Sequence, residues 1–314
     1  MNRRELLQQS GAFSLAAMAA GATFADTAFA GAALGDAAAT PAADPQGATS
    51  APPLSPPAKG SIPVAFVLAN DAVVIDFAGP WEVFQDVRIM GRDEPAFSLY
   101  TVAESKEPIT TSGGMRILPN YSFDSAPAPK VIVIPAQQDP TKALLNWIRA
   151  SSKTTDVTMS VCTGAFVLAA TGLLAGRSAT THHSAYRELA MDNANIHVMR
   201  GARFVEDGKF ASSGGLSSGI DLALHIVERY YGRDIARQTA FQMEYQGQGW
   251  LDAASNRVYA EARPANGKVL CPICSMEVDP KSAVTSVYQG QTYYFCMPPH
   301  KARFDVAPAK WLEA

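Results

Sequence analysis

The sequence predicts an α/β protein in which a parallel sheet is sandwiched by helices, followed by a small metal-binding C-terminal module. Apolar runs of strand length alternate with helical segments between residues 61 and 252, a pattern typical of sheets that are covered on both faces. Two close pairs of metal-ligating residues stand within residues 269–314. The N-terminal 60 residues share neither pattern and are interpreted separately.

Composition excludes several classes of protein. The 314 residues include 26 Lys+Arg and 29 Asp+Glu, a formal net charge of −3, so the chain lacks the basic surface of a nucleic-acid-binding protein. A hydrophobic content of 47% with 18% charged residues excludes a wholly disordered chain. No run of about 20 apolar residues follows the N-terminal segment, so we expect no stable membrane span after its removal.

Residues 1–30 have the three parts of a secretory signal. Arg3 and Arg4 open the segment, a weakly hydrophobic stretch follows over residues 11–24, and small residues lead to cleavage sites after Ala30 or, second, Ala25. The paired arginines resemble a Tat signal, so we expect a periplasmic or otherwise exported protein. The alternative is an amphipathic N-terminal helix of a soluble protein. The Ala/Pro-rich residues 31–60 are expected to form a disordered spacer.

Each element of the α/β domain rests on a local pattern of apolar residues and breakers. Pro80 is expected in the first turn of its helix, and Ser218 and Asp221 are spaced as a helix capping box. The expected strands cover residues 62–68, 97–102, 131–134, 157–161, 196–205 and 209–212, and the expected helices cover 80–90, 141–150, 164–173, 216–231 and 234–245.

Cys162 stands where a strand is expected to end and a helix to begin. The amides and dipole of a helix N-terminus stabilise a thiolate, so we expect a depressed thiol pKa and a reactive cysteine. The alternative is a buried structural cysteine, because free cysteines are among the most buried residues.

The residues around Cys162 resemble the ThiJ/PfpI superfamily of class I glutamine amidotransferase-like domains. Within it they are most similar to the branch of isonitrile hydratases and the amidase-like domains of some transcription regulators. The resemblance covers roughly residues 61–246 and implies a flavodoxin-like fold for a domain at 61–252. The matching stretches are residues 74–80, 160–182, 203–209 and 213–221.

The resemblance implies a set of site residues. Cys162 matches the nucleophile, Asp76 matches the acid that faces its sulfur, and Thr163 matches a residue that stabilises the bound intermediate. His182, followed by His183, stands where several members place a histidine near the nucleophile. Asp76 as a helix N-terminal acid and His182 as a loop histidine bonded to backbone are the alternatives. No cofactor is expected for the cysteine chemistry.

One loop departs from the resemblance. Relatives in this branch have a Gly-Gly pair after the strand that ends here at Pro135, whereas this chain has Ala136, Gln137 and Gln138. Alanine brings a Cβ where glycine lets a ligand approach the backbone closely. We therefore expect the oxyanion site and the substrate to differ from those of the relatives, while the fold stays the same.

The C-terminal module follows a linker expected at residues 253–268. Cys271 and Cys274 form one close pair and Cys296 and His300 another, and two such pairs make a tetrahedral metal site when a hairpin brings them together. Because a module of this size buries only a small core, we expect residues 269–314 to fold only with the metal. A disulfide is the alternative in an exported protein. The expected core residues are Tyr288, Tyr293, Tyr294, Phe295, Phe304 and Trp311.

Residues 271–312 resemble a YHS domain, a family thought to bind metal, with His300 where relatives often have a cysteine. Zinc is the expected ion for three thiolates and an imidazole, and Cu(I) is the alternative because the thioethers of Met276 and Met297 stand beside the cysteines.

The first hypothesis on function is an exported cysteine-dependent enzyme that hydrates an isonitrile or a similar activated small molecule. A non-catalytic periplasmic metal or redox sensor is the second, and an amidase or peptidase the third. The partners expected are a small-molecule substrate, a metal ion and, because homodimers are common in the superfamily, a second copy of the chain.

Overall fold

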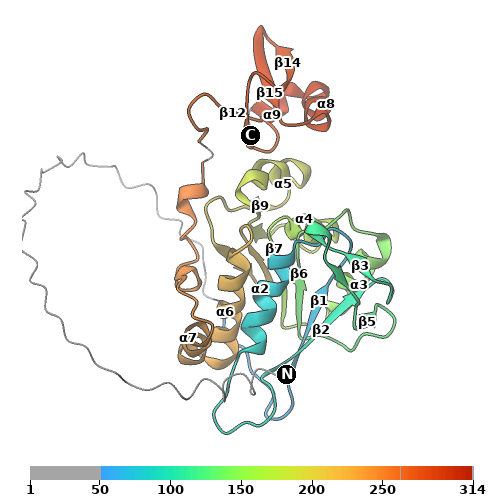
Figure 1. Ribbon diagram of the computed structural model, residues 1–314, viewed down its shortest axis with the longest axis vertical. Helices are drawn as coiled ribbons and strands as arrows, with labels where there is room; N and C mark the ends of the chain where they lie inside the picture. Colours follow the sequence, from blue (N-terminus) through green and yellow to red (C-terminus); the bar gives the residue numbers. More distant parts are fainter. Residues whose placement is uncertain (1–50, 262, 313–314) are drawn as a thin grey trace, which may run out of the picture. The chain divides into compact units, whose positions relative to one another are not determined.

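A seven-stranded sheet forms the centre of the computed structural model, which describes residues 51–261 and 263–312 (Figure 1). Its strand order is β10-β11-β7-β6-β1-β2-β5, and all neighbouring pairs are parallel except β10 with β11. The strands of this sheet are β1 (Ile62–Val67), β2 (Phe97–Ala103), β5 (Tyr121–Ser122), β6 (Val131–Ile134), β7 (Val157–Val161), β10 (Phe204–Asp207) and β11 (Phe210–Ser213).

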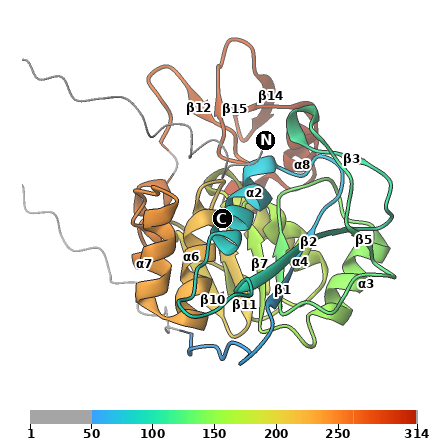
Figure 2. The same ribbon diagram turned by 60° about the horizontal axis from the view of Figure 1, so that its bottom comes forward.

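Helices cover both faces of this sheet (Figure 2). The two-stranded pairs of the domain are β3 (Ile109–Thr110) with β4 (Arg116–Ile117) and β8 (Ser178–Ala179) with β9 (His197–Val198). Its helices are α2 (Val74–Gln85), α3 (Lys142–Ser151), α4 (Gly164–Ala170), α5 (Tyr186–Asp192), α6 (Ser218–Tyr231) and α7 (Arg233–Gln242), with 3-10 turns at Ser112–Gly114, His183–Ala185, Gly249–Leu251 and Arg257–Tyr259.

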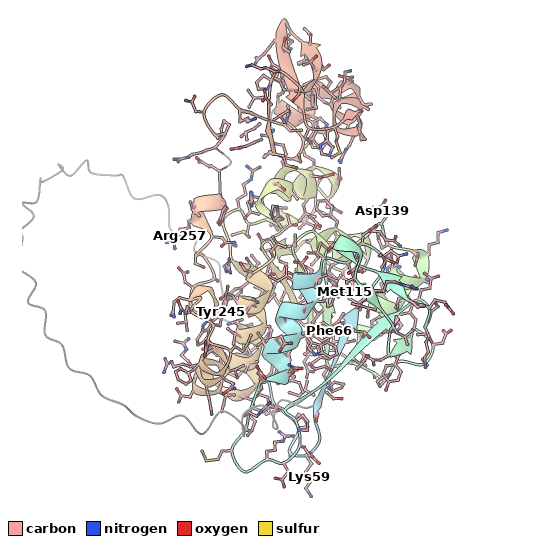
Figure 3. The ribbon with its side chains drawn as sticks, in the orientation of Figure 1. Lys59, Phe66, Met115, Asp139, Tyr245 and Arg257 are labelled. Atoms are coloured by element: carbon pink, nitrogen blue, oxygen red, sulfur yellow. The ribbon has the colours of Figure 1, made fainter. Side chains whose placement is uncertain are left out.

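The alternation of side chains along β1 explains the two-layered cover. Val64 and Phe66 belong to the core under α2, α6 and α7, whereas Ala65 and Val67 belong to the core under α3, α4 and α5. Phe66, which is labelled in Figure 3, packs on Trp81 of α2, with ring centroids 4.9 Å apart. Because successive side chains of a strand point to opposite faces, an apolar run such as this one fills both cores. The predicted sandwich of helices around a parallel sheet is confirmed.

Two local predictions for helices are wrong. Helix α2 begins at Val74 instead of Pro80, so Pro80 lies inside the helix and Asp76 lies in its first turn. The N-cap residue of α6 is Ser217, which makes no side-chain capping bond, and Asp221 is fully buried in an ion pair with Arg203. The capping box is therefore not formed, because a tertiary partner takes its carboxylate.

The domain is also longer than predicted at both ends. The Leu54 amide donates to the carbonyl of Arg229, whose guanidinium in turn donates to the carbonyl of Pro52. At the other end the amide of Arg203 donates to the carbonyl of Ala253, within the predicted linker. Residues 51–60 of the predicted spacer and the first part of the linker therefore pack on the domain. The predicted signal and the rest of the spacer lie outside the described residues.

The C-terminal module contains a hairpin over the segment where one was predicted. Its turn is Gln289-Gly290, both with positive φ, as two-residue hairpin turns require. Ile273, Phe295, Phe304 and Trp311 are buried in its core, which Tyr288 and Tyr293 border, whereas Tyr294 is not part of it. The module consists of β12 (Val269–Leu270), β13 (Glu277–Val278), β14 (Val284–Tyr288), β15 (Gln291–Phe295), α8 (Pro298–Val306) and α9 (Pro308–Leu312).

Helix α5 of the α/β domain contacts the C-terminal module. Arg303 forms ion pairs with Glu188 and with Asp192, the latter at 2.6 Å, and the Arg187 guanidinium donates to the carbonyl of Pro272 at 2.8 Å. Because the module makes these contacts with α5, experiments on it need the full chain.

Among the described helices, none is both long enough and apolar enough to cross a bilayer.

Candidate active site and metal centre

Cys162 lies in the tight turn between β7 and α4. Its φ of +57° is in the left-handed region, which is costly for a residue with a side chain and persists only where the surroundings hold it. Two hydrogen bonds do so: its amide donates to the Gly214 carbonyl at 3.1 Å, and its carbonyl accepts from the Thr181 hydroxyl at 2.9 Å. The turn places the sulfur at the carboxyl edge of the sheet, where ligands bind in open α/β folds.

Gly164 lets helix α4 begin directly against the end of β6. A Cβ at this position would lie 2.3 Å from the Ile134 carbonyl oxygen. Since backbone atoms of a buried strand cannot yield as a flexible side chain can, this residue must be glycine for the turn to close.

We expect Gly164→Ala to destabilise the domain by about 3 kcal/mol or more, the range of severe core clashes. Gly172→Ala is the matched control, because Gly172 has a φ of +79° and open space around its Cβ position. It should cost only about 1 kcal/mol for the left-handed backbone. Melting temperatures of both variants measure the difference, and equal losses would contradict the close approach at Gly164.

Asp76 faces the cysteine from the first turn of α2. It is fully buried; its Oδ2 accepts the Ala136 amide at 3.1 Å, and its Oδ1 has no hydrogen-bond partner among the described residues. Burial raises the pKa of Asp76 to about 7, although the Ala136 amide and the Cys162 thiol act in the opposite direction. The carboxyl is therefore able to exchange a proton near neutral pH.

The predicted depression of the Cys162 pKa is wrong. Burial, followed by the charge of Asp76, raises the pKa of the thiol to about 11. The amides of Thr163 and Leu216 and the Thr163 hydroxyl lower it, but by less. The amides at the helix N-terminus do stabilise the thiolate, but the cost of burying the thiolate away from water is larger. At neutral pH the sulfur carries its proton, which must leave when the sulfur attacks an electrophile.

The Leu216 amide is the site group that the sequence did not reveal. Leu216 follows the Gly214-Gly215 pair and has a φ of +52°, and its amide acts on the sulfur together with that of Thr163. The pair of glycines was the available signal, since it marks an irregular loop. Two amides converging on one sulfur can also stabilise negative charge on a bound intermediate.

The loop that replaces the Gly-Gly pair is bound to the chain after β1. Ala136 uses its amide for Asp76 and its carbonyl for the Val73 amide, at 2.8 Å. Gln137 accepts the Ala69 amide through its side chain at 2.6 Å. The Ala136 amide is therefore engaged by the carboxyl, and the amides of Thr163 and Leu216 remain as the donors at the sulfur.

His182 is placed beside the site, and its hydrogen bonds go to Ser184. Its Nδ1 lies 2.8 Å from the Ser184 hydroxyl and 3.3 Å from the Ser184 amide. The ring packs so closely on Gly215 that a Cβ there would lie 2.2 Å from it, and burial lowers its pKa. His183 stacks on Tyr259, with ring centroids 5.1 Å apart. This geometry gives His182 a role in shaping the loop that carries Leu216.

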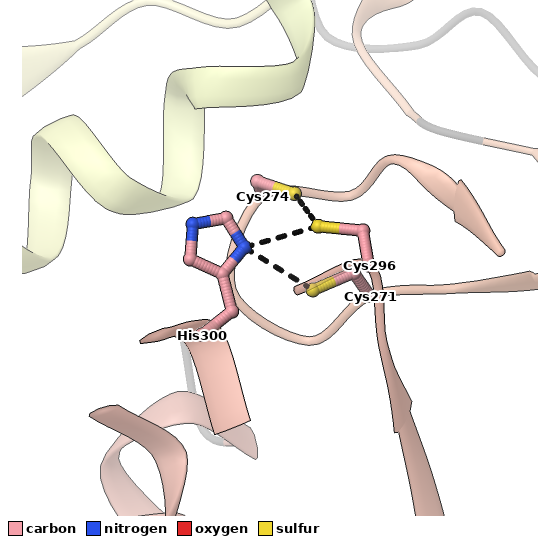
Figure 4. Close-up of side chains that lie close together, drawn as sticks. All are labelled: Cys271, Cys274, Cys296 and His300. Carbon is pink, nitrogen blue, oxygen red and sulfur yellow. Dashed lines mark hydrogen bonds between the residues drawn. The ribbon is translucent and has the colours of Figure 1, made fainter. Parts of the chain in front are cut away.

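The four predicted metal ligands converge in the C-terminal module (Figure 4). The sulfurs of Cys274 and Cys296 are 3.5 Å apart, and Nδ1 of His300 lies 3.2 Å from the Cys296 sulfur and 3.7 Å from that of Cys271. All four ligand atoms lie within 4.8 Å of one another. Tetrahedral zinc, held by sulfur at about 2.3 Å, needs neighbouring sulfurs about 3.8 Å apart. The donor set and its spacing fit such an ion.

The cluster contains separate thiols that differ in how readily they ionise. All four cysteines of the chain are free thiols. A hydrogen bond from Cys274 lowers the pKa of Cys271 to about 4, while the same interaction raises the pKa of Cys274 and burial raises that of Cys296, so one of the three sulfurs is poised as the thiolate that a metal requires. Met276 and Met297 are 49% and 41% exposed and stand outside the cluster, whose four ligands are the buried Cys271 and Cys274 and the half-buried Cys296 and His300.

The fold and the cysteine turn define a class of α/β proteins with a cysteine at the carboxyl edge of a mostly parallel sheet. The chain belongs to the DJ-1/PfpI family, which matches residues 63–229. It is 32% identical to the isonitrile hydratase of Pseudomonas putida over 215 residues, 65% of this chain and 89% of that protein.

Other relatives are regulators or share the fold. The chain is 25% identical to the HTH-type transcriptional regulator GbdR of Pseudomonas aeruginosa over 63% of its own length and 54% of the regulator's, so it spans about half of that protein. A ThiJ/PfpI family protein from Pseudomonas syringae superposes with a TM-score of 0.54 at 25% identity, over 64% of this chain and 84% of that one. Drosophila melanogaster DJ-1beta superposes with a TM-score of 0.51 at 18% identity, over 60% and 100%.

Proposed function

We propose that the domain is a cysteine-dependent enzyme that adds water to a small electrophilic molecule, with an isonitrile as the first candidate substrate. One observation carries the proposal: the Cys162 thiol shares a buried environment with an acid, Asp76, whose pKa of about 7 suits proton transfer. The 32% identity over 89% of an isonitrile hydratase supports the choice of substrate.

The residues suggest a two-stage reaction. Ionised Asp76 accepts the thiol proton while the sulfur bonds to the terminal carbon of the isonitrile, and the same proton then passes to that carbon, leaving a thioimidate. Water adds to the thioimidate carbon, the carbon–sulfur bond breaks, and an N-substituted formamide leaves with the thiol restored. The amides of Thr163 and Leu216 stabilise charge beside the sulfur.

The C-terminal module is proposed to be a YHS-type domain that binds one zinc ion through Cys271, Cys274, Cys296 and His300. Such an ion supplies folding stability to a module with a small core. We also propose that the protein is exported through a Tat-type signal to the periplasm, on the composition of residues 1–30.

Purified full-length protein is expected to hydrate an aliphatic isonitrile, with a rate that rises through pH 7 as Asp76 ionises. Cys162→Ser should lower kcat/KM by at least a thousandfold, since a hydroxyl is a far weaker nucleophile. Formamide production, followed by chromatography with parallel panels of dicarbonyls and amides, measures the activity. If the protein hydrolyses amides and does not hydrate isonitriles, the proposal is wrong and the amidase alternative holds.

A second candidate is a non-catalytic metal or redox sensor. It is favoured by the similarity to regulators such as GbdR and by the Ala136 loop, whose amide is already engaged by Asp76. This candidate predicts that Cys162 is reversibly oxidised and that no substrate in the panel is turned over.

A further inference from the structure

The loop that presents the Leu216 amide to the sulfur has no regular structure of its own. Its first residue, Gly214, accepts the Cys162 amide at 3.1 Å, and Leu216 has a left-handed backbone. An amide can stabilise a sulfur anion only while the loop is held in place. The side chain that holds this loop is therefore part of how the site works.

Arg203 contacts the loop at both of its ends. Its carbonyl accepts the Gly214 amide at 2.9 Å, and Nη2 of its guanidinium donates to the Ser217 hydroxyl at 3.1 Å. Leu216 lies between these two anchored residues. Arg203, which directly precedes β10, therefore anchors the loop on both sides of the Leu216 amide.

A buried carboxylate fixes the guanidinium in turn. Asp221 is fully buried and accepts from Nε of Arg203 at 2.6 Å. The same carboxylate accepts the Trp250 amide at 2.9 Å and the Tyr245 hydroxyl at 3.0 Å. Gly249 packs so tightly here that a Cβ would lie 2.8 Å from both partners of the ion pair. A charge pair satisfied on so many sides is rigid.

We propose that Arg203 is a positioning residue for the cysteine site, which it serves by clamping residues 214–217 so that the Leu216 amide faces the Cys162 sulfur. The inference rests on the proposed function only in that Cys162 is the reacting group. In this proposal the buried Arg203–Asp221 pair positions the loop at the sulfur as well as stabilising the fold.

Ser217→Ala is the gentle test, because it removes one anchor and leaves the ion pair intact. Alkylation of Cys162 by iodoacetamide, followed at this residue by peptide mass spectrometry from pH 7 to 11, reports thiolate formation apart from the module's cysteines. Without the clamp, the thiolate loses the Leu216 amide, so we expect the alkylation rate at pH 9 to fall at least threefold. Arg203→Lys should give a larger change in the same direction.

Tyr245→Phe is the matched control, since it removes a hydrogen bond to the same carboxylate without touching the loop. It should lower the melting temperature and leave the alkylation profile unchanged. Unchanged profiles in both Ser217→Ala and Arg203→Lys, or a shift in Tyr245→Phe equal to theirs, would overturn the proposal and leave Arg203 a purely structural residue. Because thiol titration needs no substrate, failure to hydrate isonitriles leaves this test intact.

Discussion

Asp76→Asn is expected to make Cys162 react at lower pH and to stabilise the domain above pH 7. The charge of Asp76 is the second cause, after burial, that raises the pKa of the thiol to about 11, and an amide carries no charge. Asparagine can still accept the Ala136 amide, so the local structure should persist. The alkylation midpoint of Cys162 should fall below that of the wild type, and the proposed hydration should be lost with the proton acceptor.

The stability effect has a definite sign. The pKa of Asp76 rises from 3.8 to about 7 on folding, so the folded state binds more protons between these values, and the free energy of unfolding falls as pH rises through this window. The full difference amounts to about 4 kcal/mol. Urea unfolding at pH 4, 6 and 8 should show this decline in the wild type and its absence in Asp76→Asn.

Glu206→Gln is the contrasting control. Hydrogen bonds and charge from His225 and Arg229 outweigh burial and lower the pKa of Glu206, so its charged form stabilises the fold at neutral pH. This variant should lose stability at pH 8, where Asp76→Asn gains it. A loss of stability in both variants at pH 8 would show that Asp76 is ionised and well solvated in the folded protein.

Removal of the proposed zinc ion is expected to unfold the C-terminal module and to leave the α/β domain folded. Apparent binding energies of structural zinc sites are about 10–16 kcal/mol, more than a core built on Phe295, Phe304 and Trp311 can supply by itself. In the full-length protein under reducing conditions, a chelator should abolish hydrogen-exchange protection in β14 and β15. Protection in β1, which is buried on both faces, should remain.

Variants of two histidines separate the metal from general effects of substitution. His300→Ala should bind zinc at least tenfold more weakly, because three thiolates remain without the imidazole. His197→Ala, at an exposed position in β9, should bind one equivalent as the wild type does. A module that keeps its exchange protection after complete removal of metal would contradict the requirement.

The strands of the domain were predictable because each is a short run of apolar residues buried on both faces. Residues 131–134 and 157–161 were predicted with the bounds that the structure has. The start of α2 was missed because Pro80, favoured in a first turn, lies inside this helix. Residues 253–260 were assigned to a linker because their attachment depends on Arg203, which is distant in the sequence.

The sequence by itself determined the alternation of strands and helices, the cysteine in a strand-to-helix turn and the two pairs of metal ligands. These features depend on the order of neighbouring residues. Only the tertiary structure decided the protonation of the site and the groups that hold it. Burial beside Asp76 raises the pKa of Cys162 against the helix N-terminus, and Arg203 anchors the loop of Leu216. Desolvation and charge depend on residues that folding brings together from distant segments, and no local pattern encodes them.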